Sequence, residues 1–237
     1  MKTAFDGIAF DLDGTLYPNY RLYIRLVPFL FTGAPLLVAM GKARDALRRQ
    51  YAQREKAGIP ADSALIPGED FYDLQARLMA EILGDDPAAV KERAERLIYR
   101  GWEPLFQKVA PFKWVRQTLE ELRAGGLKMG LLSDFPPENK LAAMGLDGFW
   151  DARICSESVG CLKPAPAPFL ALAREMSVAP ERLLYVGNSV TYDIIGAKNA
   201  GMAAALIISP FKKGRRPDGG ADFVFSDYRQ LSAYVLN

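Results

Sequence analysis

Five short apolar runs constrain the fold of this chain more than any other feature of its sequence. Stretches with helical spacing separate them, and three of them end directly in polar residues. Runs of this kind are typical of buried parallel strands. Their alternation with helices predicts an α/β fold whose core is a doubly wound, Rossmann-like parallel sheet. The runs are 7–10, 127–132, 183–186, 204–208 and 222–225.

One long stretch interrupts this alternation. Between residues 19 and 105 no strand pattern occurs, and the spacing of apolar residues predicts helices instead. We therefore predict an α/β core domain formed by residues 1–18 and 106–237, with a small α-helical cap domain over residues 19–105. The predicted cap helices are 19–30, 35–57, 69–83 and 86–101, and a core helix is predicted over 111–124, with Pro111 in its first turn.

Composition excludes several classes of function. The 237 residues include 30 basic and 28 acidic side chains, and the net charge of +2 gives no electrostatic case for nucleic acid as a partner. The absence of histidine excludes histidine-dependent triads and the usual zinc sites. Cys155 and Cys161 are expected to be small core thiols in a reducing compartment. Because Asp6 and Asp11 interrupt the early apolar run, no signal peptide is expected and a cytoplasmic location is predicted.

The stretch 26–40 carries no charge, although basic residues flank it. As a helix it would span about 22 Å, short of a membrane core of about 30 Å, so no transmembrane segment is expected. Three interpretations stay open: cap core, an apolar surface for substrate or a second copy, and a membrane surface. Monomer and homodimer are both compatible with them. A separate segment, 212–220, predicts an exposed loop.

Asp11 and Asp13 follow the first predicted strand. Side chains two residues apart share one side of an extended chain. Two carboxylates facing one spot repel each other, so a cation between them or a proton on one is expected. One carboxylate can attack phosphorus, while its neighbour protonates the leaving oxygen and later deprotonates water. The pair can therefore supply both a nucleophile and a general acid/base, and the resemblance given next implies Asp11 for the first role and Asp13 for the second.

Four ordered segments resemble the motifs of the haloacid dehalogenase-like superfamily. Together they lie in the two predicted core segments, which make up more than half of the chain. A single Ser or Lys-Pro would carry no weight, but four motifs in the right order are specific. The segments are Asp11-Leu12-Asp13-Gly14-Thr15 after the first strand, the strand ending at Ser133, Lys163-Pro164, and 188–193 with Asn188 and Asp193.

This resemblance implies a phosphatase that hydrolyses a small organic phosphate monoester through an aspartyl-phosphate, with Mg²⁺ as cofactor and a small phosphorylated metabolite as partner. Lys163 would be catalytic beside Asp11 and Asp13, because its charge offsets that of the nucleophile and the phosphoryl group. The Asp134 amide is expected at a helix N-terminus that receives phosphate oxygens. The implied phosphate-binding residues are Ser133, Asp134, Gly14 and Thr15. The implied ligands of Mg²⁺ are Asp11, Asp13, Asn188 and Asp193.

Two positions depart from the family pattern. Asn188 stands where Asp is common, which keeps an oxygen ligand and removes one negative charge. We therefore expect weaker magnesium binding or a larger role for Asp193. Ala165 stands where an Asp often follows the lysine.

Asp13 also separates this chain from the dehalogenases that resemble it, because a halide leaving group needs no general acid. Two alternatives to the phosphatase stay open. One is a sugar phosphomutase of the same superfamily, in which a sugar hydroxyl replaces water. The other is a catalytically weak binding or scaffold protein, which the neutral Asn188 and the apolar stretch would suit.

Overall fold

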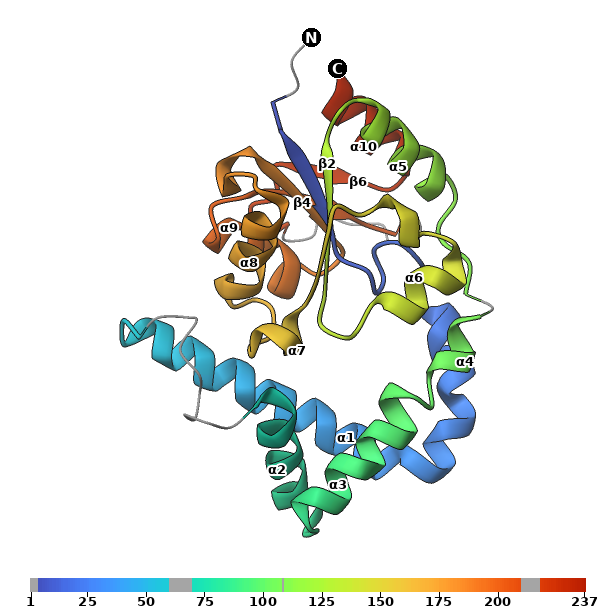
Figure 1. Cartoon of the computed structure of the whole chain (residues 1–237), viewed down its shortest axis with the longest axis vertical. Coiled ribbons are helices and arrows are strands. Elements are labelled where there is room, and N and C mark those ends of the chain that lie inside the picture. The colour runs from blue at the N-terminus through green and yellow to red at the C-terminus, as the bar shows by residue number, and fades with distance from the viewer. Residues whose placement is uncertain (1–3, 60–69, 108, 210–217) are drawn as a thin grey trace.

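The computed structural model describes residues 4–59, 70–107, 109–209 and 218–237, and its core is a parallel sheet. The strands in this described part follow the order β3-β2-β1-β4-β5-β6 (Figure 1). All of the neighbouring strands pair in parallel. This arrangement confirms the predicted doubly wound, Rossmann-like core. The strands are β1 Gly7–Phe10, β2 Lys128–Ser133, β3 Ala152–Cys155, β4 Leu183–Gly187, β5 Ala203–Ile207 and β6 Phe223–Phe225.

Helices cover both faces of the sheet, and β1 contributes side chains to both cores. Ile8 and Phe10 lie in one buried cluster with residues of α5 and α10, whereas Ala9 lies in the other cluster with residues of α8. This division follows from the alternation of side chains along a strand. The helices of the two faces are α5 Val115–Ala124 and α10 Tyr228–Leu236 on one, and α8 Pro166–Met176 and α9 Ile195–Asn199 on the other (Figure 1).

Shorter elements complete the core. The helix α6 lies between β2 and β3, and α7 follows β3. A π-helical turn precedes α9, and Gly201, just after that helix, has a φ of +81°. The bounds are α6 Glu138–Met144 and α7 Ser156–Val159, with a π-helical turn Val190–Ile194 and 3₁₀ turns Asp147–Phe149 and Pro180–Arg182.

The start of α5 differs from the prediction. The helix begins at Val115, not near Pro111. Trp114 has a φ of +72°, a left-handed conformation that breaks the helical path just before that residue. The amide of Phe112 donates a hydrogen bond to the carbonyl of Leu16 at 2.9 Å, so this segment runs beside the end of the first motif. The prediction of Pro111 in a first helical turn is therefore wrong.

Helices alone fill the chain between β1 and α5 in its described part, and they lie below the sheet in Figure 1. We call α1 to α4 the cap helices. The first, α1, is a single helix through Pro28 and Pro35, so the predicted break between residues 30 and 35 is wrong. Figure 1 shows this helix bending, as proline within a helix favours. The cap helices are α1 Tyr20–Lys56, α2 Phe71–Leu83, α3 Pro87–Ala94 followed by a π-helical segment Glu95–Tyr99, and α4 Glu103–Phe106.

The apolar stretch 26–40 has two different environments. Its C-terminal part packs in the cap, where Leu36 and Met40 are buried among residues of α2 and α3. Its N-terminal part leaves Val27 and Phe31 exposed, the latter at 88%. Only the second part of the stretch is therefore buried among the cap helices. None of the described helices is long and apolar enough to cross a membrane.

The cap helices leave and rejoin the core at adjoining points. Arg21, in the first turn of α1, donates a hydrogen bond to the carbonyl of Ala110 at 2.8 Å.

Most of the predicted loop 212–220 lies outside the described residues. Neither Cys155 nor Cys161 forms a disulfide, and Cys161 is buried, as expected for a core thiol.

Candidate active site

The predicted site residues meet at the carboxyl edge of the sheet. Asp11 follows β1, Ser133 ends β2, and Asn188 follows β4, and these three strands are neighbours. Ligand sites of doubly wound folds lie at this edge, where the strand order reverses around the first strand. Lys163 reaches the same place from the loop before α8.

Asp11 is buried, and both of its carboxylate oxygens accept hydrogen bonds. Lys163 Nζ lies 2.7 Å from Oδ1, and the hydroxyl of Thr15 lies 2.7 Å from Oδ2. Burial, together with the carboxylates of Asp193 and Asp13, raises the pKa of Asp11 to about 7, although Lys163 opposes the shift. The nucleophile predicted from the sequence is thus a carboxyl group whose charge depends on nearby cations.

Lys163 is enclosed by acceptors. Besides Asp11, it donates to Asp193 Oδ1 at 2.7 Å and to the hydroxyl of Tyr185 at 3.3 Å. Burial disfavours its charge, but Asp11 and Asp193 outweigh burial and hold the pKa of Lys163 well above its usual range. A charged lysine is therefore fixed beside the nucleophile, where it can offset negative charge on a transferred phosphoryl group.

Asp193 is committed to other contacts. Its Oδ1 faces Lys163, and its Oδ2 accepts hydrogen bonds from the amides of Asn188 at 3.1 Å and Ser189 at 2.9 Å. Its side chain is only 2% exposed. Asp193 thus has one partner on Oδ1 and two on Oδ2. Its contacts orient Lys163 and the loop that carries Asn188.

Asp13 has two partners that the sequence did not suggest. Both of its carboxylate oxygens accept from Lys140 Nζ, at 2.8 and 2.7 Å, and the hydroxyl of Tyr17 donates a further hydrogen bond. Tyr17 lies four residues on, so local spacing could have indicated it. Lys140 lies on α6, 127 residues away along the chain, and no sequence signal marks it.

Gly14 and Asn188 bring the first and fourth motifs together. Gly14 has a φ of +90°, and a Cβ added there would lie 2.2 Å from Asn188 Nδ2. The hydroxyl of Thr15 lies 3.5 Å from Asn188 Oδ1. The described residues contain no group of three or more His, Cys, Asp or Glu side chains that could hold a metal ion. A magnesium site here would therefore combine Asp11 with the Asn188 amide oxygen and the Asp13 carbonyl, a donor set that fits this cation.

Ser133 and Asp134 lie next to this centre with different surroundings. Ser133 is fully buried, and its hydroxyl accepts from the amide of Phe135 at 3.2 Å. The carboxylate of Asp134 accepts from the backbone amide of Lys163 at 3.2 Å and from Arg48 at 2.9 Å. The following helix begins at Glu138, so the expected helix N-terminus at Asp134 is wrong. Against the effect of burial, Lys163 and two arginines hold the pKa of Asp134 below its usual range.

Two arginines of α1 connect the cap helices to these core loops. Arg44 forms a buried ion pair with Glu157 and donates to the carbonyl of Asp134 at 3.1 Å. Arg48 donates to the carbonyl of Lys163 at 2.9 Å. Tyr99, from the π-helical segment, donates to Glu157 at 2.8 Å. These contacts hold the cap helices directly against the segments that carry Lys163, Asp134 and Glu157.

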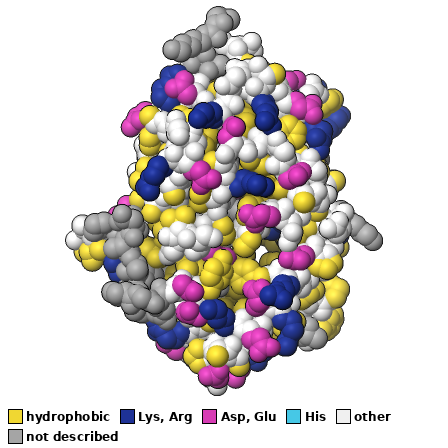
Figure 2. Space-filling model, viewed as in Figure 1, with side chains coloured by type: hydrophobic (Ala, Val, Ile, Leu, Met, Phe, Trp, Pro, Cys, Tyr) yellow, Lys and Arg dark blue, Asp and Glu magenta, His cyan; other side chains and the backbone are white. Residues whose placement is uncertain are grey.

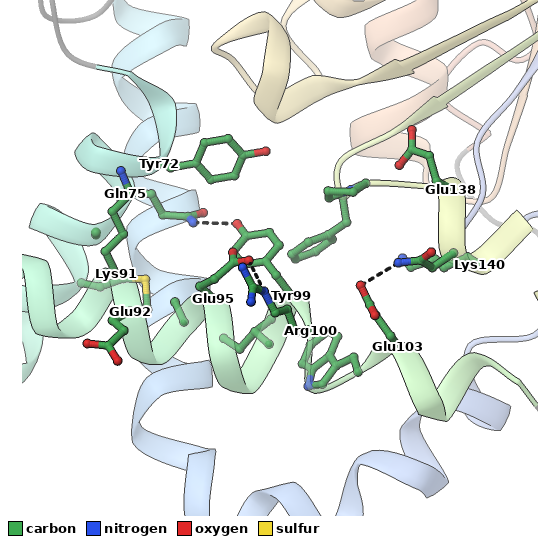
Figure 3. A pocket seen from close by; sticks show the side chains of 18 of the residues that line it. Tyr72, Gln75, Lys91, Glu92, Glu95, Tyr99, Arg100, Glu103, Glu138 and Lys140 are labelled. Carbon is green, nitrogen blue, oxygen red and sulfur yellow. Dashed lines mark hydrogen bonds and ion pairs between the residues drawn. The ribbon is translucent and has the colours of Figure 1, made fainter.

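A cavity of about 890 Å³ opens between the cap helices and residues 135–140 of the core. Lys140, the partner of Asp13, lines it. Figure 2 shows apolar side chains around a hollow on this face, with acidic and basic side chains near them. In the close view of Figure 3, Tyr72, Tyr99 and Glu95 of the cap helices lie on the side of the cavity opposite Lys140. Lys140 connects the cavity to the general acid predicted from the sequence, because Asp13 contacts this lysine but is not itself among the lining residues.

The fold and the site together define a class: a doubly wound α/β protein with a lysine-paired carboxylate at the carboxyl edge of its sheet. A sequence model of the haloacid dehalogenase-like hydrolases matches residues 5–201, most of the chain. The chain belongs to this family, as its four motifs predicted.

Relatives and solved structures agree with this assignment. A glyceraldehyde 3-phosphate phosphatase of Methanocaldococcus jannaschii is 32% identical over 237 residues, covering 98% of this chain and 97% of the relative. A phosphoglycolate phosphatase of Escherichia coli K12 is 29% identical over 234 residues, covering 90% and 84%. The crystal structure of a HAD phosphatase from Thermococcus onnurineus superposes with a TM-score of 0.63 at 25% identity, over 96% of each chain.

Proposed function

We propose that this protein is a phosphoric monoester hydrolase that forms an aspartyl-phosphate on Asp11. The observation that carries the proposal is the buried contact of 2.7 Å between the Asp11 carboxylate and Lys163, with Asp13 two residues away. The family assignment and the phosphatases among the relatives support it. The relatives also support a small-molecule phosphate monoester as substrate.

The reaction needs two displacements at phosphorus. In the first, an Asp11 oxygen attacks phosphorus, the bond from phosphorus to the leaving oxygen breaks, and Asp13 gives its proton to that oxygen. In the second, Asp13 takes a proton from water, the water oxygen attacks phosphorus, and the bond to Asp11 breaks. Inorganic phosphate leaves and both carboxyl groups return to their starting states. Lys163, held by Asp193, offsets the negative charge that gathers during both displacements.

The same residues are suited to magnesium, the cofactor that the resemblance implies. We propose the Asp11 carboxylate, the Asp13 carbonyl and the Asn188 amide oxygen as its ligands. When bound, the cation would reduce the repulsion between a carboxylate nucleophile and a phosphate. Asp193 would support this set indirectly through the amides of Asn188 and Ser189.

Hydrolysis of 4-nitrophenyl phosphate tests the proposal. The purified chain is assayed for phosphate release with Mg²⁺, with EDTA, and as the Asp11→Asn variant, which keeps the size and removes the nucleophilic charge. Asp147→Asn is the matched control, because Asp147 is exposed and lies outside the site. We expect release only with Mg²⁺ and an intact Asp11. Undiminished activity in folded Asp11→Asn would place the nucleophile elsewhere, and transfer to a sugar hydroxyl without phosphate release would favour a phosphomutase.

A further inference from the structure

We propose that the alcohol part of the substrate is large, uncharged and mostly apolar, as in an aryl or bulky alkyl phosphate, and that it occupies the cap cavity. This inference rests on the proposed phosphatase function and names the class of substrate for that site. Three features of the cavity lead to it: where the cavity begins, how large it is, and what lines it.

The cavity adjoins the lysine that contacts the predicted general acid. The general acid has to contact the oxygen that departs with the alcohol, so the alcohol extends away from Asp13. Lys140 contacts both carboxylate oxygens of Asp13 and also lines the cavity. Phosphorus lies on the other side of the leaving oxygen, toward Asp11. We therefore assign the cavity that Lys140 lines to the alcohol.

The cavity is larger than a two- or three-carbon leaving group requires. Its volume of about 890 Å³ lies in the upper part of the range of about 300–1,000 Å³ typical of pockets for drug-sized ligands. The glycolate or glyceraldehyde portion for which the relatives are named contains only a few heavy atoms, and would leave most of this apolar surface uncovered. A bulky alcohol would cover it and gain the free energy of apolar burial.

The inner surface is apolar and aromatic. Met79, Ile98 and Phe106 line it and are themselves buried. The ring of Phe135 lies 6.1 Å from that of Tyr99 and 6.2 Å from that of Trp102, so three aromatic side chains meet on the same wall. Aromatic walls favour flat apolar groups through large contact areas and edge or stacking contacts.

Charged residues at the cavity disfavour an anionic alcohol part. Four glutamates line it, against Lys91, Arg100 and Lys140. Each of these three cations already pairs with a carboxylate: Lys140 with Asp13, Arg100 with Glu95, and Lys91 with Asp73. Figure 3 shows Glu103 and Glu138 on the side of the cavity next to Lys140. Two of the glutamates are themselves in ion pairs, Glu95 with Arg100 and Glu92 with Arg96. The negative charge that a second carboxylate or phosphate would meet therefore comes from Glu103 and Glu138. The glutamates are Glu92, Glu95, Glu103 and Glu138.

A comparison of kcat/KM for three substrates tests this inference. The full chain with Mg²⁺ is assayed for phosphate release from 1-naphthyl phosphate, phosphoglycolate and glyceraldehyde 3-phosphate. We expect kcat/KM for 1-naphthyl phosphate to exceed the other two by about tenfold or more, the discrimination that an apolar pocket can supply.

A pair of variants locates the preference in the cavity. Ala88 lines the cavity from α3 and is exposed, so Ala88→Trp would fill the mouth without disturbing a buried core. Ala89 is its exposed neighbour outside the lining, and Ala89→Trp is the matched control. We expect Ala88→Trp to lower kcat/KM for 1-naphthyl phosphate by about tenfold, with little change for phosphoglycolate. Ala89→Trp should leave both substrates unchanged.

The possible results distinguish the substrate inference from the phosphatase function on which it rests. A preference for phosphoglycolate or glyceraldehyde 3-phosphate would overturn the substrate inference and leave the phosphatase intact. An equal effect of Ala88→Trp on all three substrates would also overturn it, because filling the cavity would then act on the reaction and not on the alcohol. Absence of Asp11-dependent hydrolysis of every substrate would overturn the phosphatase function itself, and the inference with it.

Discussion

Replacing Asp193 by Asn distinguishes a residue that positions Lys163 from a direct metal ligand. The substitution keeps the side chain's size and removes the charge that faces Lys163 Nζ at 2.7 Å. Hydrogen bonds to charged groups contribute about 1.5–3 kcal/mol each, and about 1.4 kcal/mol corresponds to a tenfold change in rate. Loss of this contact should therefore lower kcat by about tenfold to about 100-fold. If Asp193 acts by holding Lys163 and two backbone amides and is not a ligand of the cation, additional Mg²⁺ should not restore it.

The assay is phosphate release measured over a Mg²⁺ titration, accompanied by thermal unfolding. Loss of about 2 kcal/mol in a chain of this size would lower Tm by about 4–8 °C. The matched control is Asp151→Asn, because the Asp151 carboxylate also accepts from a backbone amide, that of Met129 at 2.7 Å, but lies away from Lys163. The reasoning is refuted if saturating Mg²⁺ returns Asp193→Asn to the kcat of the unchanged protein. That result would make Asp193 a metal ligand.

Three further predictions concern the cation, the nucleophile and the cap. Asn188→Asp adds a negative charge to the proposed ligand set and should lower the half-saturating Mg²⁺ concentration; an unchanged or higher value would exclude Asn188 as a ligand. Because Asp11 must be ionised to attack and its pKa is raised to about 7, activity at limiting Mg²⁺ should fall as pH drops below about 7. Saturating Mg²⁺ should shift this fall in activity to lower pH. A pH–rate profile that does not shift would contradict the assignment of Asp11 as a nucleophile that also binds the cation. Arg44→Met leaves Glu157 buried without its cation and should destabilise the protein by about 3–5 kcal/mol in denaturant unfolding; a change below about 1 kcal/mol would show that this pair contributes little.

The sequence predicted the core strands because burial on both faces leaves an unambiguous apolar run. The strand β3 escaped prediction because Ala152-Arg153-Ile154-Cys155 lies at the edge of the sheet and carries an exposed arginine. The break predicted in α1 had a different cause. Proline lacks an amide donor and usually ends a helix, but Pro28 and Pro35 are both exposed, and the chain absorbs them in a bent but continuous helix.

The residues of the candidate site likewise fall into those that the sequence predicted and those that it did not. Asp11, Lys163 and Asp193 were predicted because they belong to motifs with characteristic order, and they lie in direct contact. Lys140 and Arg44 were not predicted, because they reach the site only through the packing of α6 and α1. A lysine or arginine on a helix has no local pattern that distinguishes it from a solvated surface residue. Residues recruited to a site by tertiary packing therefore need the structure to identify them.

The adjoining ends of the cap segment have an evolutionary consequence. Arg21 contacts Ala110, and Leu16 contacts Phe112, so the chain departs from and returns to nearly one place on the core. Insertions are tolerated where their two ends lie close together at the surface, because the host fold need not adjust. A different helical segment could join the core at the same two points, provided that it supplied Glu157 with a cation in place of Arg44. Such an exchange would alter the cavity lining while Asp11, on the core side of both joints, kept its position.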